Sequence, residues 1–336
     1  MILSVVVPAH NAEAFLPICL DALGSSDLAR DVWEVVVVDD ASTDSTPEIA
    51  DRRADVVLRT GNVARGPAYA RNRGAEAASG EFIAFIDADV AVHEDALRLL
   101  AAHLRTTPTL VAVFGSYDEQ PADRSLVSRY RNLLHHYAHR QTAGSVATFW
   151  AGCGAVRASA FRTVGGFDEV TYARPQIEDI ELGYRLYREG AILLDPAIQA
   201  RHYKRWSVGS IMKTDFRDRA VPWVRLLLSA KSVTSASSPS LGTKALAGTA
   251  AAGSALVAVL LGCTGFGVSA WIAAAAFVGV SVAVNIPFYA WLTRHGGLPM
   301  LAVAIPLHFG YQLVSAVAVP VGGFYSLLDR RNRANG

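Results

Sequence analysis

Residues 82–90, FIAFIDADV, decide the fold that we expect for the first half of the chain. A continuous apolar run that ends in two carboxylates is typical of a buried parallel strand whose carboxyl end opens into a ligand site. Residues 35–46, VVVVDDASTDST, repeat this pattern, and the apolar run 2–7 stops at Pro8. Three predicted strands therefore end in turn-forming or charged residues, which should meet at one edge of a sheet.

Segments with helical periodicity separate these apolar runs. The predicted strands cover residues 2–7, 34–38, 56–58, 82–86 and 110–114, and the predicted helices cover 12–23, 45–53, 67–78 and 94–104. An alternation of strand and helix is the signature of βαβ units. The predicted fold class is α/β, with a Rossmann-like, mostly parallel nucleotide-binding sheet.

Carboxylates gather at the ends of the predicted strands. Asp87 and Asp89 stand two residues apart, so both can reach one hard cation that also bridges phosphate oxygens. Asp39 and Asp40 can accept hydrogen bonds from a base N–H or from ribose hydroxyls, and Arg71 can neutralise a pyrophosphate. Each group alone is common in turns and helix caps, but together they indicate a charged ligand.

Composition excludes some classes of function. The net charge of +1 offers no general attraction for nucleic acid, which we therefore do not expect as a partner. Three widely spaced cysteines without a metal-ligand pattern suit a reducing compartment. The N-terminal apolar run is too short for a signal peptide and lacks a basic segment before it. We expect the first domain to stay in the cytoplasm.

The C-terminal third is almost free of charge. Residues 245–262, 266–292 and 298–328 are each long and apolar enough to cross a bilayer, which makes three spans the simplest count. Residues 209–231 alternate apolar and basic side chains, as an interfacial helix does. The predicted domains are an α/β domain at 1–206, an amphipathic interfacial helix with a linker at 207–243, and a transmembrane region at 244–329.

Two features of the chain each allow two interpretations. Lys244, Arg294 and the C-terminal arginines all favour the cytoplasmic side, which requires either an exception to that rule or a re-entrant segment. Residues 124–140 are amphipathic and basic, so they fit either a helix packed on the sheet or a helix on the membrane surface.

Six stretches together resemble the family 2 glycosyltransferases of GT-A fold, in a membrane-anchored bacterial form. The resemblance covers roughly residues 2–206 and keeps the order and spacing of the family. The stretches are VVVPAHN (5–11), VVVVDDASTDST (35–46), ARNRGAEAASGEFIAFIDADV (70–90), FWAGCGAVRASAF (149–161), VGGFDE (164–169) and IEDIELGYRL (177–186).

The resemblance implies roles for single residues. The residues that match the nucleotide-sugar site are Pro8, Ala9, His10, Asp39, Asp40, Arg71, Asp87 and Ala88. Asp89 and Asp87, the DxD motif, match the ligands of a divalent metal, Mn or Mg. Asp179 matches the catalytic base, and Glu178 beside it completes the predicted catalytic pair. A like-charged neighbour can raise the pKa of Asp179, although such pairs also occur on solvated helix starts.

Residues 201–206, RHYKRW, resemble the Q-x-x-R-W motif of processive family members, but His202 stands where glutamine would be. This departure argues against processive synthesis. His202 is then a third metal ligand, a diphosphate contact or a core histidine. The predicted acceptor side consists of Trp150, Gly152, Gly154, Arg205 and Trp206.

The function predicted from the sequence is inverting, metal-dependent transfer of a sugar from a UDP- or GDP-linked donor to a lipid or lipid-linked acceptor. The predicted location is the cytoplasmic (inner) membrane, as a multi-pass protein with its catalytic domain in the cytoplasm, in glycolipid synthesis for the cell envelope. The alternatives are a processive polysaccharide synthase and a non-catalytic nucleotide-sugar-binding membrane protein. A nucleotidyltransferase is disfavoured because PAHNAEAF (8–15) lacks a glycine-rich phosphate loop.

Overall fold

The computed structural model of the protein describes residues 1–229 and 242–334. Within these residues the chain forms two compact units. The first unit comprises residues 1–123 and 138–204, and the second comprises residues 124–137, 205–229 and 242–334. Most of the linker predicted before residue 244 lies outside the described residues.

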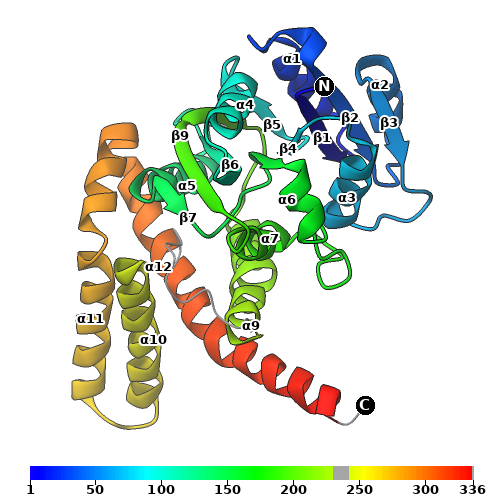
Figure 1. Ribbon diagram of the computed structural model, residues 1–336. Coiled ribbons are helices and arrows are strands. Elements are labelled where there is room, and N and C mark those ends of the chain that lie inside the picture. Colours follow the sequence, from blue (N-terminus) through cyan, green and yellow to red (C-terminus); the bar gives the residue numbers. More distant parts are fainter. Residues whose placement is uncertain (230–241, 335–336) are drawn as a thin grey trace. The chain divides into compact units, whose positions relative to one another are not determined.

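A sheet of nine strands, counted over the described residues, forms the centre of the first unit (Figure 1). The strand order is β3-β2-β1-β4-β8-β6-β9-β5, and β7 pairs with β9. The strands are β1 (Leu3–Ala9), β2 (Trp33–Asp39), β3 (Val56–Arg59), β4 (Phe82–Ile86), β5 (Val90–Val92), β6 (Leu110–Tyr117), β7 (Gly144–Val146), β8 (Cys153–Arg157) and β9 (Ala191–His202).

The predicted α/β class is confirmed, but the sheet is mixed rather than mostly parallel. Strands β3, β2, β1 and β4 are parallel neighbours, as are β6 and β9. Strand β8 runs antiparallel between β4 and β6, and β9 pairs antiparallel with β5 and β7. The parallel half corresponds to the strands that were predicted from apolar runs, and the antiparallel pairings come mostly from strands that were not.

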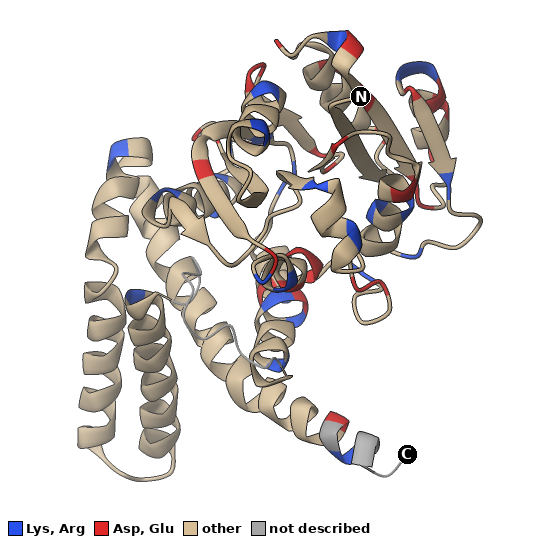
Figure 2. Ribbon diagram, viewed as in Figure 1, with Lys and Arg blue, Asp and Glu red and all other residues tan. Residues whose placement is uncertain are grey.

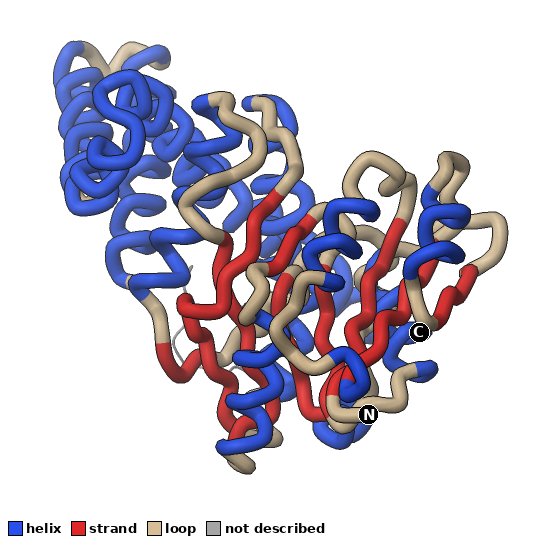
Figure 3. The backbone as a smooth tube through the Cα atoms, turned by 90° about the horizontal axis from the view of Figure 1, so that it is seen from above, coloured by secondary structure: helices blue, strands red, loops and turns tan. Residues whose placement is uncertain are grey.

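Helices cover both faces of the sheet (Figure 3). The helices are α1 (Leu16–Gly24), α2 (Thr46–Arg53), α3 (Pro67–Ala77), α4 (Ala96–Thr106), α6 (Ala158–Thr163) and α7 (Glu178–Leu186). One core cluster joins the strands to α1 and α4, and the other joins them to α3, α6 and α7. Along β1, Val5 and Val7 enter the first cluster while Val6 enters the second, as the two-residue period of a strand requires.

The turn after β2 holds an alanine in the left-handed region of backbone space. Ala41 has φ of 60°, which costs an L-residue with a Cβ atom roughly 1–2 kcal/mol. We expect Ala41→Gly to raise the free energy of unfolding by up to about 1 kcal/mol, after the extra entropy of glycine in the unfolded chain is subtracted. Thermal unfolding followed by circular dichroism measures this change.

The matched control is Ala54→Gly, because Ala54 has φ of −94° and carries no such strain. That substitution should lower stability by about 1 kcal/mol, through the unfolded-state entropy and the loss of a methyl group that packs against the core. Equal destabilisation by both substitutions would contradict the assignment of strain to Ala41.

The second unit is helical. Its helices are α8 (Val208–Lys213), a π-helical stretch (Thr214–Ala220), α9 (Val221–Ser229), α10 (Thr243–Cys263), α11 (Val268–Ala283) and α12 (Ile286–Ala334). Figure 2 shows charged residues spread over the first unit and almost absent from α10 and α11. In α12 the backbone leaves helical geometry at Gly297, where φ is 64°.

Two described helices are long and apolar enough to cross a membrane, namely α10 and the segment Ile286–Asp329 of α12. The second predicted span, 266–292, is divided instead, because α11 has 16 residues and ends at Ala283. At about 1.5 Å per residue, α11 by itself is shorter than a hydrocarbon core of about 30 Å. Length and hydropathy alone give weak support to a membrane location.

Residues 124–140 were predicted to form a helix on the sheet or on a membrane surface. They form helix α5 (Leu126–Gln141), and the apolar face of this helix packs elsewhere. Its Tyr130 and Leu133 share an apolar cluster with Phe288, Leu292 and Leu307 of α12. The apolar face of this helix therefore packs within the second unit, on the C-terminal helix, and neither the sheet nor a membrane surface is needed to cover it.

Candidate active site

The ends of β1 and β2 lie side by side, as the sequence predicted. The parallel register pairs Pro8 with Val38 and Ala9 with Asp39. The Asp40 N–H donates to the Ala9 carbonyl (2.8 Å), and His10 Nδ1 lies 2.7 Å from the Asp40 carbonyl. Five of the residues predicted to bind the nucleotide, Pro8, Ala9, His10, Asp39 and Asp40, are thus held together at one edge of the sheet.

The Asp40 carboxylate is already engaged within the chain. It accepts from the Thr60 hydroxyl (2.7 Å), the Arg65 N–H (2.9 Å) and the Gly66 N–H (2.7 Å). Asp40 therefore shapes the loop between β3 and α3, which borders this edge of the sheet. Asp39 is less committed, since its Oδ1 accepts one N–H, that of Ser42, at 3.2 Å.

Arg71 on α3 forms two ion pairs, a buried one with Glu178 and a partly buried one with Asp87. Its Nη2 donates to Asp87 Oδ1 (2.7 Å) and its Nη1 donates to Glu178 Oε1 (2.9 Å). The residue is 5% exposed. Burial disfavours a charged guanidinium, but the two carboxylates outweigh that effect and raise the pKa of Arg71. Arg71 therefore joins the first acid of the DAD stretch to the start of α7.

The second acid of DAD, Asp89, faces His202 at the end of β9. Asp89 Oδ2 lies 3.5 Å from His202 Nε2, and its side chain is 28% exposed. The Tyr117 ring stacks on His202, with centroids 4.5 Å apart, and Trp150 contacts Tyr117 edge-on. Ala88 between the two acids is buried. Two carboxylates, an imidazole and an aromatic wall thus meet at the carboxyl ends of β4 and β9.

The pKa values of Asp87 and Asp89 are shifted in opposite directions. Burial raises the pKa of Asp87 despite its pairing with Arg71. Burial would also raise the pKa of Asp89, but contact with His202 and the charge of Lys204 outweigh it, and this pKa is lowered. Of the two acids, Asp89 is therefore the one whose surroundings favour the ionised form.

The donor set at Asp89 fits a divalent cation. Carboxylate and imidazole groups are ligands for Mn²⁺, and a cation that binds phosphate usually keeps several waters and needs few protein ligands. Over residues 1–229 and 242–334, no cluster of three or more His, Cys, Asp or Glu side chains is arranged to hold a metal. Asp89 and His202 are the two groups here that would hold such a cation.

The predicted base lies at the start of α7. Asp179 Oδ1 accepts from the Ile180 N–H (2.8 Å), and its Oδ2 accepts weakly from the Ala151 N–H (3.3 Å). Asp179 is half-buried, whereas Glu178 is 5% exposed. The helix N-terminus favours negative charge at both positions.

The predicted acceptor residues fall in both units. Gly152 packs so closely that an added Cβ would lie 2.5 Å from the Trp150 ring, and at Gly154 it would lie 2.6 Å from the Trp150 carbonyl oxygen. The Asp87 N–H donates to the Gly152 carbonyl at 3.3 Å, which places this wall beside the DAD stretch. Arg205 and Trp206 belong to the second unit.

Within the second unit, Trp206 is buried and bound to α5. Its backbone N–H donates to Ser128 Oγ (2.8 Å), and the Arg131 guanidinium lies 5.4 Å from its ring centroid. The Trp206 ring therefore has little surface left for stacking on an acceptor.

Two residues of the site, Tyr117 and Lys204, were not predicted from the sequence. Tyr117 was missed because the predicted strand ended at residue 114, whereas β6 continues to Tyr117. Lys204 was missed because only the residues of the R-W motif were considered, yet its charge acts on Asp89. The sequence signal that could have identified Lys204 is its position two residues after His202, another predicted site residue.

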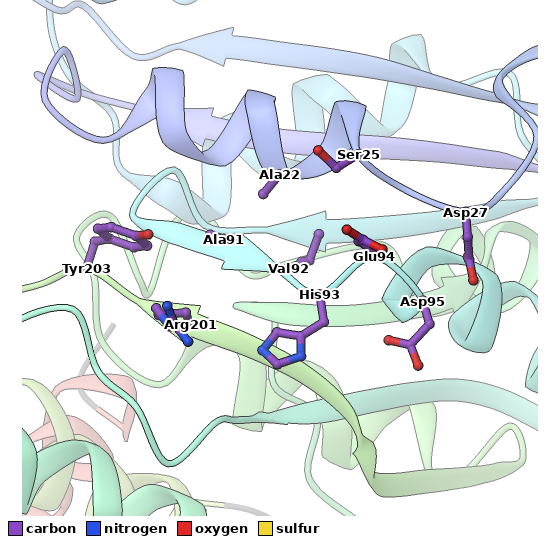
Figure 4. A pocket seen from close by; sticks show the side chains of 10 residues that line it. All are labelled: Ala22, Ser25, Asp27, Ala91, Val92, His93, Glu94, Asp95, Arg201 and Tyr203. Atoms are coloured by element: carbon purple, nitrogen blue, oxygen red, sulfur yellow. The ribbon is translucent and has the colours of Figure 1, made fainter.

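A cavity of about 590 Å³ lies beside β5 and β9 (Figure 4). It is lined by Ala22, Ser25, Asp27, Ala91, Val92, His93, Glu94, Asp95, Arg201 and Tyr203. None of the predicted site residues lines it. The Tyr203 N–H donates to the Asp89 carbonyl (2.9 Å), so the cavity borders Asp89 through the backbone.

Comparison with known proteins agrees with this geometry. Residues 4–165 match the family model described as glycosyl transferase family 2. The chain is 30% identical over 222 residues to validoxylamine A glucosyltransferase of Streptomyces hygroscopicus subsp. limoneus, a match that covers 56% of this chain and 48% of the relative. The chain thus spans about half the length of the curated relatives it matches first.

Two solved structures show a similar fold. A mannosyltransferase from Pyrobaculum calidifontis in complex with GDP-Man and Mn²⁺ has a TM-score of 0.61 at 22% identity, covering 94% of this chain and 86% of that one. TarS residues 1–349 of S. aureus in complex with UDP-GlcNAc has a TM-score of 0.50 at 18% identity, covering 94% and 90%. At these identities the likeness concerns the fold.

Proposed function

We propose that the protein, whose residues 4–165 match the model of glycosyl transferase family 2, transfers a sugar from a nucleotide diphosphate sugar to an acceptor hydroxyl, with inversion at the anomeric carbon. One observation carries the proposal. The Arg71 guanidinium pairs with both Asp87 and Glu178, so the DAD acids and the acid-bearing start of α7 converge at one edge of the sheet. This arrangement supports a single site in which donor-binding groups and a general base act together.

In this mechanism the edge formed by Asp39 and His10 binds the nucleotide, and Asp87 contacts the ribose. Asp179 accepts the proton of the acceptor hydroxyl, whose oxygen attacks the anomeric carbon on the side opposite the diphosphate. In-line displacement inverts the configuration at that carbon. A divalent cation held by Asp89, with Asp87 and His202 as further ligands, would stabilise charge on the departing diphosphate.

We place the acceptor at a membrane. Support comes from α10 and α12, which are long and apolar enough to span a bilayer, and from basic residues on the preceding helices. A lipid or lipid-linked acceptor follows if the protein is a multi-pass component of the inner membrane with its catalytic unit in the cytoplasm. UDP- and GDP-linked donors are both candidates, since the similar structures hold one of each.

A panel of labelled nucleotide sugars tests the proposal. Membranes that contain the protein are incubated with each donor and Mn²⁺ or Mg²⁺, and the lipids are then extracted. We expect label from one donor in the organic phase. Label only in aqueous or insoluble polymer would favour the polysaccharide synthase. Nucleotide binding without transfer from any donor would favour a non-catalytic binding protein.

Removal of divalent cations is expected to lower the transfer rate at least about 100-fold, because the leaving diphosphate then loses its main counter-charge. The rate is measured before and after addition of EDTA, and again after excess Mn²⁺ or Mg²⁺ is restored. Recovery with metal separates this effect from loss of the fold. A rate that EDTA leaves unchanged would contradict metal dependence.

A further inference from the structure

Both oxygens of Glu178 are committed to partners inside the protein. Oε1 accepts from Arg71 Nη1 at 2.9 Å, and Oε2 accepts from the Gln176 N–H at 2.8 Å. The side chain is 6% exposed. A general base needs a lone pair that faces the acceptor hydroxyl, and the observed contacts leave Glu178 poorly placed for that. Glu178 therefore has a role other than that of a base.

Arg71, the partner of Glu178, is held on a second side by the loop after α6. Its guanidinium carbon lies 5.4 Å from the Phe167 ring centroid. Phe167 is fixed in turn by Asn72, whose side-chain amide donates to the Phe167 carbonyl and accepts from the Phe167 N–H, both at 2.9 Å. Arg71 thus cannot turn toward a diphosphate without giving up both ion pairs, which would leave the buried Glu178 carboxylate without its counter-charge.

We propose that Glu178 is a positioning residue that acts through Arg71: it fixes the Asp87 carboxylate against the donor and the start of α7, which carries Asp179, against the acceptor. The inference rests on the proposed function and removes Glu178 from the predicted catalytic pair. It also reassigns Arg71, which was predicted to neutralise the pyrophosphate, to a bridge between two acids.

The chemistry of the bridge explains why a carboxylate is required at position 178. Arg71 Nη1 and the Gln176 N–H are both donors, and a carboxylate offers an acceptor to each of them. The amide of glutamine offers one acceptor, so that its NH₂ group would face one of these donors. Glutamine at this position keeps the size of the side chain and breaks one end of the bridge.

The test is a double-mutant cycle on the full-length protein in detergent, with Glu178→Gln and Arg71→Lys. We expect Glu178→Gln to lower kcat about 10–100-fold through misplacement of Asp179, while the acidic limb of the pH–rate profile is retained. It should weaken binding of the nucleotide diphosphate, measured by calorimetry with Mn²⁺, by a smaller factor. In the Arg71→Lys background the same substitution should have little further effect on either quantity, since the fork that it acts through is absent.

Glu189→Gln is the matched control, because it makes the same chemical change on an exposed side chain that follows the same helix. It should leave kcat and nucleotide binding unchanged. Melting temperatures of all variants show whether each one is folded. Glu178→Asp keeps both acceptors on a shorter side chain, so we expect its kcat to lie between those of the wild type and Glu178→Gln.

Three results would overturn the proposal. Loss of the acidic limb in Glu178→Gln, with a rate as low as that of Asp179→Asn, would make Glu178 the base. Independent, multiplicative effects in the cycle would show that Glu178 does not act through Arg71. Wild-type values in Glu178→Gln would exclude any role. If the wild-type protein binds nucleotide but transfers no sugar, the proposed function fails while the cycle in binding still tests the bridge.

Discussion

Replacement of Asp179 by asparagine lowers sugar transfer about 10²–10⁴-fold while nucleotide binding stays near the wild-type level, the range expected when a general base is removed. The amide cannot accept the proton of the acceptor hydroxyl. Asparagine has nearly the same shape as aspartate, so its carbonyl oxygen can keep the stronger hydrogen bond from the Ile180 N–H (2.8 Å). The weaker hydrogen bond from the Ala151 N–H (3.3 Å) is then the one that the variant loses. The measurement is kcat with the best donor, together with calorimetric titration of the nucleotide diphosphate.

Asp31→Asn is the control for this substitution, because it removes the same charge from an exposed carboxylate near the start of β2. Its transfer rate should equal that of the wild type. Asp179→Asn protein that still transfers sugar at more than about a tenth of the wild-type rate would be incompatible with a base role for Asp179. Loss of nucleotide binding in Asp179→Asn would instead point to a disturbed donor site.

The parallel half of the sheet was readable from sequence because local pattern and burial agree there. Each of the strands β1, β2 and β4 is buried on both faces, so that its sequence is a continuous apolar run, and each ends where polar residues begin. The grouping of the strand-end residues follows from parallel register alone. This is why Ala9 and Asp39 could be expected side by side.

The other half of the sheet lacked such a signal. Strand β9 contains Pro196, which ordinarily argues against a strand. The pairing with β6 jumps from Leu194 opposite Phe114 to Gln199 opposite Ser116, so the proline lies in a bulge where no ladder hydrogen bond is needed. Strand β8 was missed because CGAVR is short and built largely of small residues.

The roles of single residues were the hardest feature to predict from the sequence, because they depend on partners that lie far apart in the chain. Arg71 meets Asp87 after 16 residues and Glu178 after 107, and no spacing rule connects these positions. An arginine near a phosphate-binding edge was therefore predicted to contact the phosphate. The ion pairs show that its charge is already balanced within the protein.

Replacement of Asp215 by alanine is expected to lower the free energy of unfolding by about 3–5 kcal/mol, the largest effect on stability that we predict. Asp215 in the π-helical stretch accepts from Arg131 Nη2 (2.6 Å) and Nη1 (3.1 Å) of α5. The two side chains are 1% and 3% exposed, so the alanine variant leaves a buried guanidinium without its counter-charge. Unfolding in detergent micelles, followed by circular dichroism, measures the loss.

Two further variants separate loss of a buried counter-charge from loss of any acid in this segment. Asp218→Ala removes a more exposed carboxylate, 3.7 Å from Arg217, and should cost less than about 1 kcal/mol. Combining Arg131→Met with Asp215→Leu should recover most of the stability, because no charge is then buried alone. If the double variant is as unstable as Asp215→Ala, packing around position 215 rather than the ion pair holds α5 to the π-helical stretch.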